Sequence, residues 1–104
     1  MSEKLSEITS AAQFADSVGT WFRVTWGADE TAELELISAT ASRKAGVSGA
    51  AREPFSLVFR AKSREFYLPQ AMYLFQHERH GALDLFIVPI GPDEIGMRFE
   101  AVFN

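Results

Sequence analysis

Cysteine is missing from this 104-residue sequence, so disulfide bonds, thiolate metal sites and cysteine nucleophiles are excluded. No segment approaches the run of about 18 apolar residues that a membrane-spanning helix needs. The start of the chain is polar and includes acidic side chains, whereas a signal peptide needs an apolar core there. We therefore expect a protein that stays in the cytoplasm and does not enter a membrane.

Basic residues are also few, because ten Lys and Arg stand against fourteen Asp and Glu and leave a net charge of −4. This balance disfavours nucleic acids and anionic membranes as partners, since such binders use excess positive charge to displace counterions. Hydrophobic residues, by contrast, make up 47% of the chain and include nine phenylalanines. We expect one folded domain over residues 1–104 with a largely aromatic core.

One short helix is indicated near the N-terminus. Its apolar residues recur at the spacing of a helical face: Ala11, Phe14, Ala15 and Val18. Ser10 followed by Gln13 has the spacing of a capping box, and Gly19 is a typical stop.

From Thr20 onward, apolar and polar residues alternate with the period of β-strands. Residues 41–53 have no such period and predict a mobile loop. The expected strands are 20–26, 32–40, 55–61, 71–77, 82–90 and 97–103. The pattern predicts a mainly β fold of about six antiparallel strands, forming a small barrel or a strongly twisted sheet with the helix packed on it.

The first two expected strands suit a hairpin. A register with Val24 opposite Leu34 places Arg23 opposite Glu35 as an outward-facing ion pair. This agreement favours that register.

Both histidines of the chain lie in the stretch QHERHG, residues 76–81. A hairpin loop of Arg79, His80 and Gly81 puts His77 at the rim of the inner face and His80 at an exposed turn tip. The spacing differs from the i, i+4 pair of a helical zinc motif, and no third ligand is near. We expect no metal and no other cofactor.

The same hairpin has apolar residues on its outward side. Met72 and Leu74 line up there with Val88 and Phe86 in the expected register. An antiparallel sheet with one wet face should alternate cleanly, so this second apolar face implies a cover. The N-terminal helix, through Phe14 and Val18, is one candidate cover; a second copy of the chain or another protein is the other.

The sequence also allows two other hypotheses about function. A barrel can bind a small ligand in a pocket lined by Trp26, Tyr73 and His77. An enzyme is the third possibility, but no catalytic residue is indicated: the serines lack a nucleophile-elbow motif, and the carboxylates Asp93, Glu94 and Glu100 show no sign of an acid/base pair.

Three alternating cations, Arg60, Lys62 and Arg64, can grip an anion. Solvated edge charges are the more common explanation of such a pattern, because they discourage aggregation between strands.

Four stretches carry a resemblance to a known family: EPFSLVFR (53–60), LPQAMYLFQH (68–77), GALDLFIVPIGP (81–92) and MRFEAVFN (97–104). Together they resemble a family of small bacterial proteins described as a domain of unknown function. The resemblance implies a compact, mostly β domain and brings no activity or catalytic residues. It also implies an association with phage-tail-like fibre or collar proteins, which suits a structural role. Our leading hypothesis is a non-catalytic protein-binding or assembly module, acting with a partner protein or as a homo-oligomer through Met72, Leu74, Phe86 and Val88.

Overall fold

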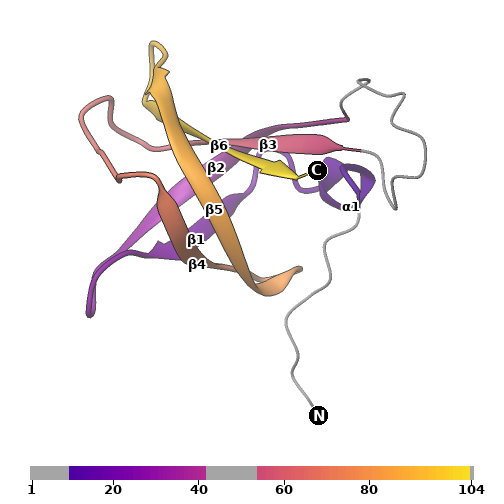
Figure 1. Cartoon of the computed structure of the whole chain (residues 1–104), viewed down its shortest axis with the longest axis horizontal. Coiled ribbons are helices and arrows are strands. Elements are labelled where there is room, and N and C mark those ends of the chain that lie inside the picture. The colour runs from indigo at the N-terminus through magenta and orange to yellow at the C-terminus, as the bar shows by residue number, and fades with distance from the viewer. Residues whose placement is uncertain (1–9, 42–53, 104) are drawn as a thin grey trace.

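The computed structural model describes residues 10–41 and 54–103, which form a closed antiparallel barrel with one short helix at its end (Figure 1). The elements are α1 (Ala12–Ala15), β1 (Trp21–Thr25), β2 (Thr31–Ala41), β3 (Phe55–Arg60), β4 (Ala71–His77), β5 (Gly81–Pro92) and β6 (Met97–Phe103). The mainly β prediction, with about six strands and a short helix, is confirmed, and the sheet closes rather than staying open. Of the predicted loop 41–53, Ala41 ends β2, and the rest lies outside the described residues.

The strands follow one another around the barrel in the order β1-β2-β3-β6-β5-β4. The barrel closes where β4 pairs with β1, with Arg23 opposite Gln76, Val24 opposite Phe75 and Thr25 opposite Leu74. Residues far apart in the chain therefore become neighbours on the outer surface across this seam.

The interior of the barrel is filled with aromatic rings. Phe22, Phe59, Phe75 and Phe99 have no exposed surface. The ring of Phe59 lies 5.2 Å from that of Phe22 and 4.9 Å from that of Phe75, centroid to centroid. Side chains of this size are enough to fill a small barrel, so the phenylalanine-rich composition forms a packed core as expected.

The β1–β2 hairpin has the predicted faces but another register. Phe22 is opposite Leu34, and Val24 is opposite Ala32 rather than Leu34. The predicted pair of Arg23 with Glu35 is therefore wrong, and Arg23 faces Glu33 instead. The turn is tighter than expected, because the Trp26 N–H donates to the carbonyl of Glu30 at 3.0 Å.

The β4–β5 hairpin shows the same kind of correction. His77 pairs with Gly81, which has φ +72°, so residues 78–80 form the loop. Met72 is consequently opposite Phe86 rather than Val88, and Leu74 is opposite Asp84. Each strand still presents the predicted residues to the inside and to the outside.

The helix is shorter than predicted, since the sequence indicated a helix between a cap at Ser10 and a stop at Gly19, whereas α1 contains four residues and the chain continues as turns to Gly19. Half of the capping box is present: the Ser10 N–H donates to the Gln13 side-chain oxygen at 3.1 Å. Phe14 is the buried residue of α1, which packs on β2 at the end of the barrel. No helix in the described residues is long and apolar enough to cross a bilayer.

Candidate functional site

An apolar surface lies on the outside of β4 and β5, which we call the outer patch: Met72, Leu74, Phe86 and Val88. Met72 and Phe86 are directly opposite each other across the two strands, and they are 59% and 48% exposed. Leu74 and Val88 are half-buried beside them. The structure thus brings all four predicted residues to one side of the barrel.

The helix does not cover this surface. Phe14 is buried at the end of the barrel, while Val18 is itself 44% exposed. Of the two covers that the sequence left open, the helical one does not remove Met72 or Phe86 from solvent.

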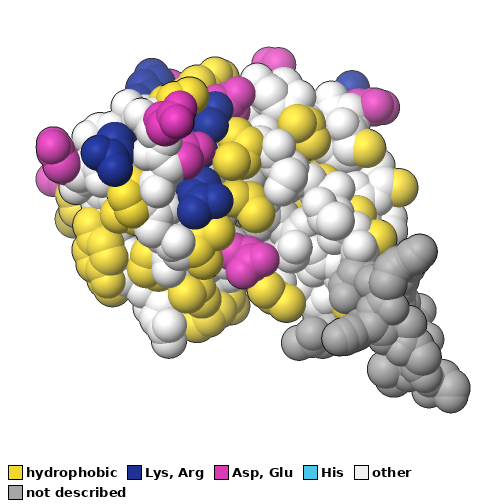
Figure 2. Space-filling view, turned by 90° about the horizontal axis from the view of Figure 1, so that it is seen from above, with side chains coloured by type: hydrophobic (Ala, Val, Ile, Leu, Met, Phe, Trp, Pro, Cys, Tyr) yellow, Lys and Arg dark blue, Asp and Glu magenta, His cyan; other side chains and the backbone are white. Residues whose placement is uncertain are grey.

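Further apolar side chains near the outer patch escaped the sequence reasoning. Ile90, on β5, is 37% exposed, and Val102, on β6, is 57% exposed. Figure 2 shows one face of the molecule, on which hydrophobic side chains lie between charged side chains of both signs. The alternation of the last strand contains the signal for Val102: its neighbours Ala101 and Phe103 face the core, so Val102 must face outward.

Acidic side chains border the outer patch. Asp84 pairs with Leu74, and Glu100 pairs with Val88. The patch therefore has an apolar centre with carboxylates at its rim.

The alternative ligand residues lie in different places. His77 stacks on Phe22, at 4.1 Å between ring centroids, near the start of β1. Trp26 follows the other end of β1 and contacts the ring of Phe66 edge-on at 6.3 Å. The Tyr73 hydroxyl donates to the carbonyl of Pro69 at 2.6 Å, and burial raises the Tyr73 pKa. The three side chains therefore do not converge on one ligand.

The two histidines converge, contrary to the prediction of an exposed His80. Their rings lie 5.0 Å apart, and the His80 ring is 4.5 Å from that of Phe14. The His80 Nε2 atom shares a hydrogen bond of 2.9 Å with the hydroxyl of Ser17, a buried residue. The reason is tertiary: α1 packs over the turn, and Ser17 is 63 residues away in sequence.

Hydrogen bonds define the protonation of His77. Its Nδ1 atom accepts the backbone N–H of Arg79 at 3.0 Å, so its proton lies on Nε2. That proton is donated to the Thr20 hydroxyl at 2.8 Å, and Thr20 in turn donates to the carbonyl of Ser17 at 2.6 Å. Burial lowers the pKa of both His77 and His80. Within the described residues, no group of three or more His, Cys, Asp or Glu side chains is placed to hold a metal ion.

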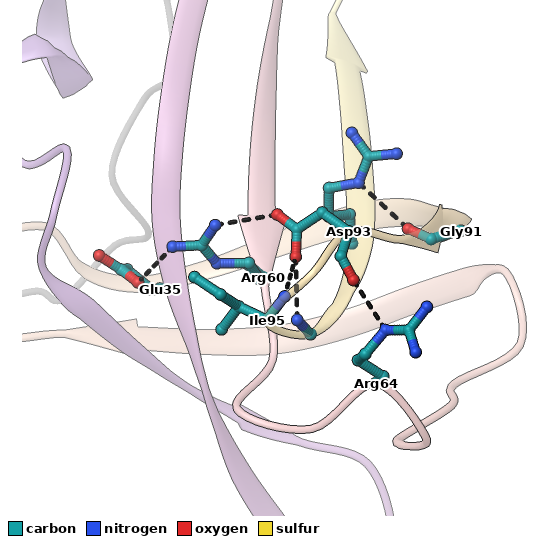
Figure 3. A network of polar contacts seen from close by, with 8 residues as sticks. Glu35, Arg60, Arg64, Gly91, Asp93 and Ile95 are labelled. Atoms are coloured by element: carbon teal, nitrogen blue, oxygen red, sulfur yellow. Dashed lines mark hydrogen bonds and ion pairs between the residues drawn. The ribbon is translucent and has the colours of Figure 1, made fainter.

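The predicted cation row is engaged within the molecule. Figure 3 shows Arg60 between Asp93 and Glu35, which it contacts at 2.9 and 3.3 Å. Arg64 donates to the Asp93 carbonyl at 2.8 Å, and Lys62 pairs with Glu33 at 3.2 Å. These contacts tie the segment after β3 to the β5–β6 turn and to β2.

Asp93 organises that turn. One of its carboxylate oxygens accepts the N–H groups of Ile95 and Gly96, at 2.8 and 2.9 Å. The Gly96 N–H, together with Arg60, holds the pKa of Asp93 well below its usual range. The Asp93 carboxylate is therefore used in turn formation, and the sequence had given no sign that Asp93 and Glu94 form an acid/base pair.

A groove of about 710 Å³ runs along the outside of β1 and β4, next to the β4–β5 turn. Its lining includes Trp21, Arg23, Gln76 and Glu78. Of the three ligand residues predicted from the sequence, His77 lines this groove and Trp26 and Tyr73 do not. Sequence reasoning missed it because β1 and β4 are brought together only by barrel closure.

We compared the chain with known proteins, solved structures and protein families. No curated protein and no solved structure matches this chain significantly. A protein family matches over residues 9–103, which is nearly the whole chain and includes every residue of the outer patch and the groove. The chain therefore belongs to the family described as Domain of unknown function (DUF6916).

Proposed function

We propose that this domain is a non-catalytic binding module that docks a partner protein through the outer patch, as a component of a cytoplasmic assembly. The observation that carries the proposal is the cross-strand pair of Met72 and Phe86, which are 59% and 48% exposed. Large apolar side chains that gather on a surface favour burial by a partner, and aromatic residues and Met are enriched at interface centres.

The filled interior supports a binding module rather than a carrier of enclosed ligands. Core phenylalanines occupy the space that a larger barrel would leave for a ligand. The outside of the barrel is then the surface left for recognition.

The rim charges indicate which kind of partner fits. Asp84 and Glu100 flank the patch, so a partner with an apolar centre and Lys or Arg around it is complementary. A two-fold dimer through the same patch would place the Asp84 and Glu100 carboxylates of both copies at one interface, with no cation of the patch to offset them, which is unfavourable. A different protein is thus the favoured partner, and the resemblance to proteins that accompany phage-tail-like structures supports an assembly role.

The test compares two charge insertions at similarly exposed apolar positions. Phe86→Asp places a carboxylate in the outer patch, whereas Val18→Asp places one at a 44% exposed site after α1. Each variant is expressed in the native cell, and the mass and composition of its complexes are measured by sedimentation and mass spectrometry, after circular dichroism has shown that it is folded.

We expect Phe86→Asp to weaken the complex by about ten-fold or more, as truncation of a central aromatic anchor does, and Val18→Asp to leave it intact. Equal binding by wild type and Phe86→Asp would refute the proposal. A wild-type dimer that Phe86→Asp converts to a monomer would replace the foreign partner with a second copy.

A further inference from the structure

The groove on β1 and β4 is separate from the outer patch and is lined mainly by polar side chains. Its volume of about 710 Å³ is in the range of small-molecule sites, roughly 300–1,000 Å³. It lies on the outer face of the barrel, so an extended ligand can enter it from solvent.

Strand register places three planar polar groups in a row across the groove. Arg23 on β1 is opposite Glu33 on β2 and opposite Gln76 on β4. Neighbouring strands are about 4.8 Å apart, so the row spans roughly 10 Å. On the far side of Gln76 the row continues to Ala82, whose small side chain leaves the groove open.

An aromatic ring stands beside this row. Trp21 lies on the same outer face two residues before Arg23 and is 41% exposed. The Lys62 ammonium lies 5.0 Å from the Trp21 ring centroid and 3.2 Å from the Glu33 carboxylate. The indole is thereby held in place at the edge of the polar row.

The polar groups of the groove have unused bonding capacity. Within residues 10–41 and 54–103, the side chains of Arg23, Gln76 and Glu78 make no hydrogen bond with one another or with another described residue. A guanidinium, an amide and a carboxylate together offer several donors and acceptors in flat, paired arrangements.

The charges of the site balance. Arg23, Glu33 and Glu78 line the groove, and Lys62, which lies outside its lining, neutralises Glu33, so the groove does not favour an ion of either sign. A phosphate-bearing ligand is further disfavoured by the net charge of −4.

We propose that this groove binds a neutral oligosaccharide. Each hydroxyl of a sugar both donates and accepts, so adjacent hydroxyls can satisfy the planar groups of Arg23, Gln76 and Glu78, while the C–H side of the ring packs on the Trp21 indole. The proposal is independent of the outer patch, which lies toward the other end of β4.

The experiment screens the full-length protein against an array of neutral oligosaccharides of glucose, galactose, mannose and N-acetylglucosamine, with acidic glycans and nucleotides as further probes. Trp26→Phe leaves Trp21 as the single indole, because the chain has two tryptophans. We expect a neutral glycan to bind and to change Trp21 fluorescence in this variant. Trp21→Ala and Arg23→Ala, both exposed positions, should each weaken binding by about ten-fold or more.

Phe86→Asp is the matched control, since it disrupts the outer patch and should leave glycan affinity unchanged. The proposal is overturned if no neutral glycan binds, if only acidic glycans or nucleotides bind, or if binding survives both groove substitutions.

Discussion

At the scale of single residues, the two histidines form a neutral cluster between phenyl rings. His77 has its Nδ1 occupied by a backbone N–H, so a second proton has no acceptor there and would face that donor. His80 lies against Phe14 and shares its Nε2 bond with Ser17. The bond that His77 Nδ1 accepts therefore requires an uncharged His77 ring.

This cluster makes stability depend on pH. Burial lowers both pKa values below the ordinary value of 6.5, so the unfolded chain binds more protons than the folded one below that pH. The stabilisation is complete above pH 6.5 and is lost as the pH falls from there through the lowered pKa values. The slope is at most about 1.4 kcal/mol per pH unit for each histidine, and solvent screening keeps it smaller.

Thermal unfolding followed by circular dichroism from pH 8 to pH 5 measures this effect. The variant His77→Gln with His80→Gln keeps polar side chains but cannot titrate, so its Tm should vary less over this range. A Tm that rises as the wild type is acidified, or an equal slope in the double variant, would contradict this assignment.

For the strands, the sequence predicted which face of the sheet each side chain occupies better than it predicted which residues pair across neighbouring strands. Both hairpins are displaced by two residues from the expected register, with Phe22 rather than Val24 opposite Leu34, and Met72 rather than Leu74 opposite Phe86. A shift of two keeps every side chain on its face, because the strand period is two. The hydrophobic pattern thus distinguishes odd from even shifts, whereas turn geometry decides among the even ones.

Side-chain contacts between elements far apart in the chain could not be predicted from the sequence. Nothing in QHERHG indicates that Ser17 will cover His80, because the contact depends on how α1 docks at the end of the barrel. The three cations after Val58 were recognised as a group, but their partners, Asp93 among them, come from a turn that only the fold brings near.

The β5–β6 turn depends on a residue without a side chain. A Cβ at Gly96 would overlap the carbonyl oxygen of Ala61. Adjacent to this contact, the Ala61 N–H donates to the Met97 carbonyl at 2.8 Å, so moving Ala61 disturbs the connection of β6 to the segment after β3.

We expect Gly96→Ala to lower the free energy of unfolding by about 1–3 kcal/mol, as overpacking does. Gly27→Ala is the control, because a Cβ there meets the flexible side chain of Glu30, with Cγ at 2.7 Å. Urea unfolding of both variants decides the matter: a Gly96→Ala protein as stable as wild type would show that the turn tolerates displacement.

For the whole molecule, the features that lie within single strands could be predicted from the sequence, whereas those that form only when the barrel closes could not. The fold class, the aromatic core and the outer patch follow from alternation along single strands. The groove does not, because Arg23 and Gln76 meet only when β4 returns to β1. Side chains from all six strands fill the interior of the closed barrel.

We propose that another protein covers the outer patch in the cell, and oxidation of its side chains tests this most directly. Met72 is a sensitive reporter, since an exposed methionine is readily oxidised and this one is 59% exposed. Hydroxyl-radical footprinting can therefore compare the isolated chain with the complex taken intact from the native cell, with Trp21 in the groove as an internal reference.

We expect Met72 and Phe86 to be oxidised several-fold more slowly in the complex, and Trp21 to be oxidised at the same rate in both samples. Equal oxidation of Met72 in the isolated chain and in the complex would contradict it.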